Sequence, residues 1–298
     1  MRFVSFRGPG GQAVAGVLRG DRVLDLSHRA CDGWRGETAP TLAALLEAGL
    51  SSWVSRIGDA PVDEDAWRPL QAVQLLAPLP RPGLVVGAAY NFTDALAERG
   101  MAAPGEPVTF VRRGRTVIGP GEPIRLPPDV GAVGYEAELA VVIGRRALKV
   151  PRDQAMACVA GYTAHNDVSG SELIRQDGGV FVRGKNLPAS APLGPWLVSA
   201  DELPDPYAVG IRLDIDGRLL QTGSTATMLF DIATLIAHVS QRVPLEPGDI
   251  IATGTPAGVA AMHQPPAWLR PGCTVSVELD GLGRLSNPVT TGEPFLEP

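Results

Sequence analysis

Residues 133–144, VGYEAELAVVIG, decide the fold because they combine the pattern of a buried strand with two acidic side chains. Residues two apart in a strand point to the same face, so Glu136 and Glu138 share a face with Ala140 and Val142. The opposite face carries apolar and aromatic residues only: Tyr135, Ala137, Leu139, Val141 and Ile143. Because apolar residues continue along both faces, we expect this strand to be buried inside a domain.

The two glutamates need a physical explanation if the strand is buried. On an exposed strand face, such a pair would be ordinary solvated side chains. Two buried carboxylates cannot both stay ionised unless one takes a proton or a cation lies between them. A third acid, Asp167, ends another predicted strand in the stretch AHNDVSG. Three carboxylates make an all-oxygen site, which suits Mg²⁺ or Mn²⁺, or Ca²⁺, and suits zinc poorly.

Composition limits the classes of protein to which the chain can belong. Hydrophobic residues make up 45% of the 298 residues, which excludes a disordered chain. The net charge of -6 argues against a nucleic-acid partner or an anionic membrane surface, both of which need a concentrated basic face. No apolar run is long enough to span a bilayer, and the first residues, MRFVSFRGPGG, lack the apolar core of a secretory signal. The three cysteines show no CxxC or zinc-site spacing, so we expect a reduced, cytoplasmic protein.

The chain divides into a small N-terminal domain, residues 1–78, and a larger domain, residues 79–298. The proline-rich connector APLPRPG, residues 77–83, marks the boundary. The elements predicted for the first domain are strands in RFVSF and on either side of a Gly20–Asp21 turn, a short helix in TLAALLEAGL, and a second helical stretch around Trp53–Leu75.

The larger domain is predicted to consist mainly of strands. Two hairpins are expected about Asp216–Gly217 and Asp280–Gly281, and one amphipathic helix over residues 228–243. Clustered strands with few helices favour a β-rich α+β fold over alternating βαβ units.

Several motifs of the larger domain resemble the fumarylacetoacetate hydrolase superfamily in their order and approximate spacing. These motifs are FVRRGRTVIGPGEPIRLP (110–127), YEAELAVVIG (135–144), GYTAHNDVS (161–169), PLGPW (192–196) and LEPGDIIATGTPAGV (245–259). The resemblance covers residues 79–290. It implies a mixed β-roll or sandwich behind a small N-terminal α/β domain, and a homodimer as the usual assembly.

The resemblance also assigns roles to individual positions. Glu136, Glu138 and Asp167 match the family's ligands for a divalent cation, and Lys185 in VRGKN matches its active-site lysine. Without the resemblance, Lys185 would be interpreted as an ordinary surface lysine and the loop around Thr255 as a tight turn. The residues predicted to contact the substrate are Tyr90, Arg112, Tyr135, Thr255 and His263.

Two departures from the family pattern bear on the mechanism. Family members carry an NYxxHxxE-like segment with a catalytic histidine, whereas NFTDALAERGM (91–101) places Ala95 at that position, or Thr93 in an alternative alignment. Family members also read NDVSARDxQ, whereas this chain reads NDVSGSELI, with Ser171 in place of the arginine and Ile174 in place of the glutamine.

Other residues of the chain could take over the proton transfer that the missing histidine would perform. The candidates are Asp94 and Glu98 in the same segment and His165 beside the predicted metal site. Each has a simpler explanation, because acids are favoured in the first turn of a helix and His165 could cap a strand end by hydrogen bonding.

The sequence therefore predicts a metal-dependent enzyme that acts on a 2-oxo acid or β-dicarbonyl compound through a metal-stabilised enolate. A positioned general base contributes about 10²–10⁴-fold to the rate, and hydrolysis of a carbon–carbon bond depends on one to activate water. Its absence favours a lyase or isomerase that decarboxylates, tautomerises or hydrates its substrate. The alternatives are a carbon–carbon hydrolase of the acylpyruvate or fumarylacetoacetate type, a member of a biosynthetic pathway, and a non-catalytic ligand-binding protein on the same scaffold.

Overall fold

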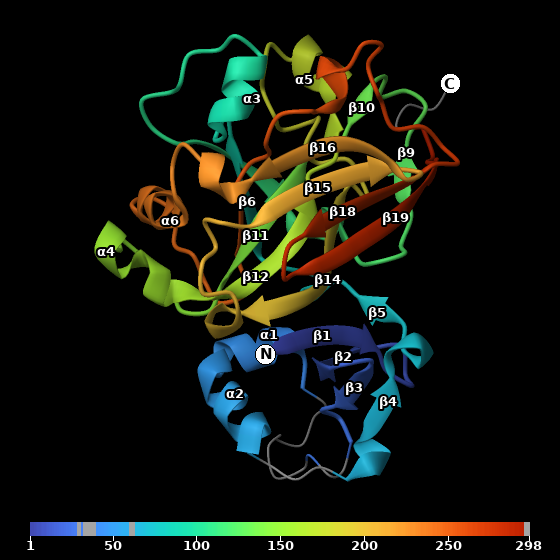
Figure 1. Cartoon of the computed structure of the whole chain (residues 1–298), viewed down its shortest axis with the longest axis vertical. Helices are drawn as coiled ribbons and strands as arrows, with labels where there is room; N and C mark the ends of the chain where they lie inside the picture. The colour runs from blue at the N-terminus through green and yellow to red at the C-terminus, as the bar shows by residue number, and fades with distance from the viewer. Residues whose placement is uncertain (29–30, 32–39, 60–62, 295–298) are drawn as a thin grey trace.

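The computed structural model describes residues 1–28, 31, 40–59 and 63–294, and it is a strand-rich α+β fold, as predicted. Figure 1 shows two lobes, a smaller one built from the N-terminal segment and a larger one that contains most of the strands. Strands from both lobes belong to one large sheet, so the lobes are joined through backbone hydrogen bonds as well as through the connecting chain.

The N-terminal lobe packs an antiparallel sheet against two short helices. The hydroxyl of Thr41 caps the first helix by accepting a hydrogen bond from the Ala44 N–H at 3.2 Å. Its strands are β1 (Arg2–Arg7), β2 (Ala13–Arg19), β3 (Arg22–Asp25), β4 (Trp67–Pro69) and β5 (Leu75–Leu76), and its helices are α1 (Leu42–Glu47) and α2 (Leu50–Asp59).

The strands and the first helix predicted for this lobe are confirmed, but the prediction of a helical stretch around Trp53–Leu75 is confirmed only in part. Helix α2 ends at Asp59, and residues 60–62 lie outside the described part. Two single-turn 3-10 helices follow, Glu64–Ala66 and Leu70–Ala72, with β4 between them and β5 after them. Pro69 has no N–H to donate inside a helix, and it ends the short strand β4 instead.

The large sheet continues from the N-terminal lobe into the main lobe through the antiparallel pairing of β1 with β14, in which Phe3 lies opposite Leu197. From that junction the strands follow the order β14-β12-β11-β17-β6-β7, and β8 pairs with β14. These strands are β6 (Leu84–Ala89), β7 (Val108–Arg113), β8 (Val117–Ile118), β11 (Ala137–Ile143), β12 (Val159–Asn166), β14 (Ala191–Ser199) and β17 (Ile250–Ala252).

A second, five-stranded sheet lies against the first in the main lobe and has the order β16-β15-β18-β19-β9 (Figure 1). Both predicted hairpins are confirmed here, since Asp216 and Gly217 turn between β15 and β16 and Gly281 turns between β18 and β19. The strands are β9 (Ile124–Leu126), β15 (Gly210–Ile215), β16 (Arg218–Ser224), β18 (Thr274–Leu279) and β19 (Gly283–Thr291), with β10 (Val133–Gly134) and β13 (Ser169–Gly170) forming a separate pair.

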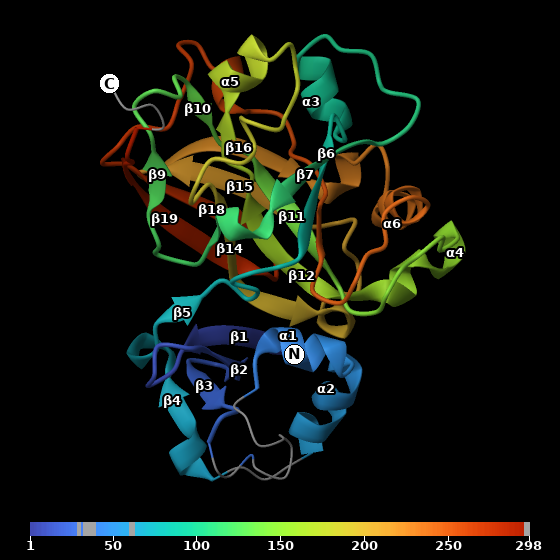
Figure 2. The same ribbon diagram turned by 180° about the vertical axis from the view of Figure 1, so that it is seen from behind.

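The described part of the main lobe contains four short α-helices: α3 (Thr93–Glu98), α4 (Arg152–Ala155), α5 (Ser171–Gln176) and α6 (Ile232–Ser240). The helix predicted over residues 228–243 is present but shorter, because Asp231 caps α6 by accepting a hydrogen bond from the Thr234 N–H at 2.8 Å. Helices α3 and α5 lie at the end of the main lobe that is remote from the N-terminal lobe (Figure 2). Within the described ranges, no helix has both the length and the hydrophobicity needed to cross a membrane.

Strand β11 separates two hydrophobic cores, which confirms the division of its side chains between two faces. Ala140 and Val142 pack in a core shared with the helices and strands of the N-terminal lobe. The other face packs in the core between the two sheets, and its members are Tyr135, Ala137, Leu139, Val141 and Ile143. The glutamates belong to the first of these faces, at the beginning of β11, and neither is a member of the core that Ala140 and Val142 share with the N-terminal lobe.

Candidate metal centre and active site

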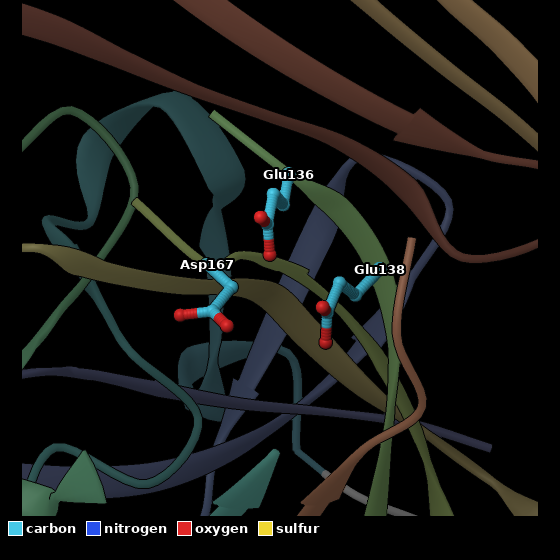
Figure 3. A group of neighbouring side chains, drawn as sticks. All are labelled: Glu136, Glu138 and Asp167. Carbon is cyan, nitrogen blue, oxygen red and sulfur yellow. The ribbon is translucent and has the colours of Figure 1, made fainter. Parts of the chain in front are cut away.

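Three carboxyl groups meet at the end of β11. The pairing of β11 with β12 places Glu138 opposite His165, and Asp167 follows directly after β12. The Asp167 N–H donates to the Glu136 carbonyl at 2.9 Å, which holds the two chain segments together at this point. Oxygen atoms of Glu136, Glu138 and Asp167 all lie within 4.8 Å of one another, and Figure 3 shows their side chains gathered in one place.

Two buried cations compensate part of the negative charge of this cluster. The Lys185 ammonium donates to Glu136 at 2.7 Å and to Asp167 at 2.6 Å. The guanidinium of Arg112 donates to the other oxygen of Asp167, and also to the Ser190 hydroxyl at 2.6 Å and the Ser190 carbonyl at 2.8 Å. Burial lowers the pKa of Lys185, and it lowers the pKa of Arg112 to about 10. Each carboxylate oxygen of Asp167 therefore accepts a hydrogen bond from a different cation.

Glu138 is the carboxylate for which this compensation is least complete. Its Oε2 atom is buried and has no hydrogen-bond partner in the described part of the chain. Burial and the neighbouring charge of Glu136 raise the pKa of Glu138 to about 8. Without a cation, the ionised form of Glu138 is therefore unfavourable. A divalent cation fits the three carboxylates Glu136, Glu138 and Asp167, because it would place a positive charge beside Glu138. Hard cations also prefer carboxylate oxygens.

A cavity of about 170 Å³ opens beside the cluster. The residues that line it are of three main kinds: the acidic cluster with Lys185, a group of aromatic rings, and small apolar side chains. The residues that line it are Ala88, Ala89, Tyr90, Asn91, Ala95, Arg99, Phe110, Glu136, Glu138, Ile174, Phe181, Lys185, Gly254 and Thr255.

Five of the residues singled out in the sequence as site residues line this cavity: Tyr90, Glu136, Glu138, Lys185 and Thr255. The backbone of Tyr90 adopts a positive φ of 59°, which is unusual for a residue with a side chain and turns the chain at the end of β6. The Thr255 hydroxyl donates to the Ala137 carbonyl at 2.8 Å and accepts from the Gln221 side chain at 3.0 Å. Thr255 is therefore fixed in position at the cavity wall.

Three other candidates are buried behind the site. Arg112 and Tyr135 are fully buried, and neither is among the residues that line the cavity. His165 is also buried, its Nδ1 atom is hydrogen-bonded to the Pro192 carbonyl at 2.8 Å, and burial lowers its pKa to about 3. His165 is therefore a neutral imidazole that lies behind the metal ligands.

The remaining candidates tie loops together at the rim. Asp94 accepts hydrogen bonds from the Thr227 hydroxyl at 3.1 Å and the Ala257 N–H at 3.3 Å. Glu98 accepts from the Gly258 N–H at 3.0 Å, and the Nε2 atom of His263 is hydrogen-bonded to the Gly258 carbonyl at 3.0 Å. These contacts fix α3 against the loop that follows β17.

Helix α3 turns Ala95 toward the cavity, at the position where the family pattern has a histidine. Asp94 and Glu98 are four residues apart and share the face that binds the loop, whereas Ala95 and Arg99 are four residues apart and share the face that lines the cavity. Ile174, which replaces the family's glutamine, also lines the cavity. The departures seen in the sequence therefore change the walls of this cavity.

Sequence reasoning identified Tyr90 but missed Phe110, Phe181 and Arg99. The rings of Phe110 and Phe181 lie 4.9 Å apart, Tyr90 lies 6.4 Å from Phe181, and the Lys185 ammonium lies 5.0 Å from the centre of the Phe110 ring. The four-residue spacing from Ala95 could have identified Arg99. The sequence contains no comparable signal for Phe181, which follows α5 in an irregular segment.

The chain is similar in sequence and in fold to known proteins. The family model described as "Fumarylacetoacetate (FAA) hydrolase C-terminal" matches residues 84–290. The mitochondrial oxaloacetate tautomerase fahd2 of Xenopus laevis is 39% identical over 218 residues, which cover 73% of this chain and 68% of that protein.

Two solved structures have the same fold over nearly the whole chain. Fumarylacetoacetate hydrolase from Exiguobacterium antarcticum superposes with a TM-score of 0.81 at 33% identity, covering 98% of this chain and 100% of that one. The 5-carboxymethyl-2-hydroxymuconate delta-isomerase from Mycobacterium smegmatis superposes with a TM-score of 0.76 at 32% identity, with the same coverage.

Proposed function

The chain belongs to the fumarylacetoacetate hydrolase family, and from this premise we propose that it is a divalent-metal-dependent lyase or isomerase. Its substrate is a 2-oxo acid or a β-dicarbonyl compound, and the reaction passes through an enolate. Tautomerisation, decarboxylation and hydration all share that intermediate.

The observation that carries the proposal is the cluster of Glu136, Glu138 and Asp167 beside a cavity that also contains Lys185. The three carboxylates would hold Mg²⁺ or Mn²⁺. A cation bound there would polarise the carbonyl group of the substrate and stabilise the enolate by several kcal/mol.

The side chains around the cluster prepare it for such a substrate. Lys185 lines the cavity and adds a fixed positive charge close to where the enolate oxygen would develop, in a buried environment that strengthens its effect. Arg112 and Lys185 orient Asp167 by binding both of its oxygens. The fixed hydroxyl of Thr255 and the aromatic rings position the rest of the substrate.

The composition of the cavity wall favours a lyase or isomerase over a hydrolase. Among the described residues that line the cavity there is no histidine, and the carboxylates are Glu136 and Glu138 alone. A hydrolase needs a base to generate hydroxide, whereas an enolisation needs chiefly an electron sink and a way to move one proton. The tautomerase activity in the name of the Xenopus relative belongs to this second kind of chemistry.

The proposal is tested with metal-stripped protein to which Mg²⁺ or Mn²⁺ is restored. Oxaloacetate, an acylpyruvate and a 2-hydroxydienoate are followed by ultraviolet absorbance, and the products are identified by chromatography. We expect metal-dependent enol decay or release of carbon dioxide, without the two acids that hydrolysis of an acylpyruvate would yield. Metal-dependent cleavage of the acylpyruvate would instead identify a hydrolase, and absence of turnover with metal bound would indicate a ligand-binding protein.

A further inference from the structure

Arg99 lines the same cavity as the acidic cluster but belongs to a different wall. It follows the last turn of α3, four residues after Ala95, and both residues face the cavity. Asp94 and Glu98 hold this helix against the loop after β17, so the position of Arg99 is set by contacts that do not involve its own side chain.

Arg99 differs from the other cations near the site in having no acidic partner. Lys185 is bound to Glu136 and Asp167, and Arg112 is bound to Asp167. No carboxylate of the described residues lies within ion-pair distance of Arg99, although its side chain is only half-exposed at the cavity. A guanidinium in such a place offers its donors to whatever occupies the cavity.

The sum of the charges at the site indicates the charge of a ligand that would neutralise the site. When the three carboxylates are ionised, as cation binding requires, Glu136, Glu138 and Asp167 carry three negative charges. Lys185 and Arg112 carry two positive charges, which leaves one negative charge. A divalent cation brings the cluster to one positive charge. Arg99 then adds a second positive charge at another wall, so the filled site would match a ligand with two separated negative charges.

The residues opposite α3 do not provide this second anion site. Ile174 on α5 lines the cavity as an apolar side chain, and Ser171 at the start of α5 donates its hydroxyl to the Ser169 carbonyl at 3.4 Å. Ala95, on the same face of α3 as Arg99, lines the cavity with a small side chain that carries no polar group. Among the described residues that line the cavity, Arg99 is therefore the cation without an acidic partner that could bind a group at the end of the substrate remote from the metal.

We propose that Arg99 binds a second carboxylate of the substrate and thereby selects 2-oxo diacids over 2-oxo monoacids. This inference rests on the proposed function for the binding of the first carboxylate and the 2-oxo group at the metal end. An arginine suits the second carboxylate because its planar fork can donate two parallel hydrogen bonds to the two oxygens. The cavity of about 170 Å³ has room for a short diacid.

The test is calorimetric binding to the Mn²⁺-loaded protein of two ligands that differ only at one end. 2-Oxoglutarate ends in a carboxylate, and 2-oxovalerate ends in a methyl group in the same place. We expect the wild-type protein to bind the diacid roughly 10- to 100-fold more tightly, as a charge-assisted hydrogen-bonded pair would produce. Arg99→Met should remove that preference and leave the affinity for 2-oxovalerate unchanged, while Arg99→Lys should retain part of it.

Arg145→Met is the matched control for the loss of one positive charge. Arg145 is exposed and follows β11 at the end opposite to the glutamates. This variant should keep the full preference for the diacid. An unchanged preference in Arg99→Met, or an equal effect of both substitutions, would overturn the inference.

A third ligand separates this inference from the proposed function. Glutarate has both carboxylates but no 2-oxo group. If both 2-oxo acids bind equally well, the proposed function stands and the role of Arg99 is refuted. If neither 2-oxo acid binds but glutarate binds in an Arg99-dependent way, the role of Arg99 stands and the proposed function is refuted. If none of the three ligands binds to the metal-loaded protein, both are refuted.

Discussion

Arg112 and Asp167 form an ion pair in which both side chains are completely inaccessible to solvent. Arg112 comes from β7, while Asp167 follows β12, and these strands are separated in the sheet by β11, β17 and β6. The pair thus connects the metal-binding end of the sheet to a strand several positions away. A buried pair of this kind contributes most visibly when one partner is removed, because the other charge is then left without compensation.

Replacement of Arg112 by Met should lower the free energy of unfolding by about 3 kcal/mol, because Asp167 keeps Lys185 but loses its second buried cationic partner, and Ser190 loses its buried donor. Urea unfolding followed by circular dichroism measures this change. Arg112→Lys keeps the charge but provides fewer directed donors, so its loss should be smaller. A Met variant as stable as the wild-type protein would show that the pair does not hold the site together.

Replacement of Glu138 by Gln should abolish metal binding without destabilising the metal-free protein. The amide of the substituted Gln is neutral and needs no compensating cation. Oε2 of Glu138 has no hydrogen-bond partner among the described residues, so the substitution breaks no hydrogen bond at that atom. For the wild-type protein, Mn²⁺ at 100 times its dissociation constant should add about 2.7 kcal/mol of stability. Thermal melting with and without Mn²⁺ should show this increase in the wild-type protein and in Glu47→Gln, an exposed control on α1, but not in Glu138→Gln.

Replacement of Lys185 by Met should reduce kcat by about 10²–10³-fold, the loss seen when a group that stabilises developing negative charge is removed. Met retains the apolar contact with the ring of Phe110, so the fold should be preserved. Mn²⁺ binding measured by calorimetry should persist, because the three carboxylates remain. Loss of metal binding together with activity would assign Lys185 a structural role only.

Gly161 is a position in β12 where any side chain would collide with the neighbouring strand. A Cβ atom there would lie 2.1 Å from the carbonyl oxygen of Val198 on β14. Gly161→Ala should therefore cost about 1–3 kcal/mol of stability through forced backbone shifts. Gly58→Ala is the control, because a Cβ atom there meets nothing within 4 Å and alanine should stabilise α2 by up to about 1 kcal/mol. Equal melting temperatures for the two variants would contradict this.

Asp231 should make the stability of α6 depend on pH. Burial acts to raise its pKa, but the hydrogen bonds from Thr234 and the ion pair with Arg152 outweigh it, so the pKa lies below its ordinary value. The charged cap therefore stabilises the folded state above a pH of about 4, the ordinary pKa of an aspartate in the unfolded chain. This contribution is lost as the pH falls through the lowered pKa of Asp231. Asp231→Ala should cost about 1 kcal/mol at pH 7.

Asp231→Asn is the informative comparison, because it keeps a cap acceptor but cannot titrate. Between pH 5 and pH 3, the melting temperature of Asp231→Asn should fall less than that of the wild-type protein. The reason is that the wild-type protein loses the charged cap in this range, whereas the variant has no charge to lose. Parallel decreases in the two proteins would show that other carboxylates account for the acid sensitivity.

Local patterns in the sequence predicted the elements on which the site is built. The two-residue period of β11 correctly placed Leu139 and Ala140 on opposite faces, which the structure packs in different cores, and it placed Glu136 and Glu138 on the same face. Asp167 was proposed as the third acid because it ends another predicted strand, and the family motifs then matched all three; it lies thirty-one residues beyond Glu136 in the chain and beside it in the fold.

The cavity walls depended on contacts that no local pattern encodes. The spacing of Asp94 and Glu98 was visible, but which face of α3 meets the loop after β17 depends on tertiary hydrogen bonds such as the one from Gly258 to Glu98. For the same reason, the candidate Arg112 was expected at the substrate and lies instead behind Asp167, fully buried. The strand order that carries β1 onto β14 was likewise invisible, because those strands are nearly 190 residues apart.

The pairing of β1 with β14 has a consequence for how this molecule can be divided. A protease that cuts the connector at residues 77–83 would not release two independent bodies, since the first strand of the chain remains hydrogen-bonded within the sheet that carries the metal ligands. Ala140 and Val142 bind the two halves further by sharing a core with α1 and α2. The chain should therefore unfold in a single cooperative step, and separately expressed halves should assemble with each other before either one folds fully.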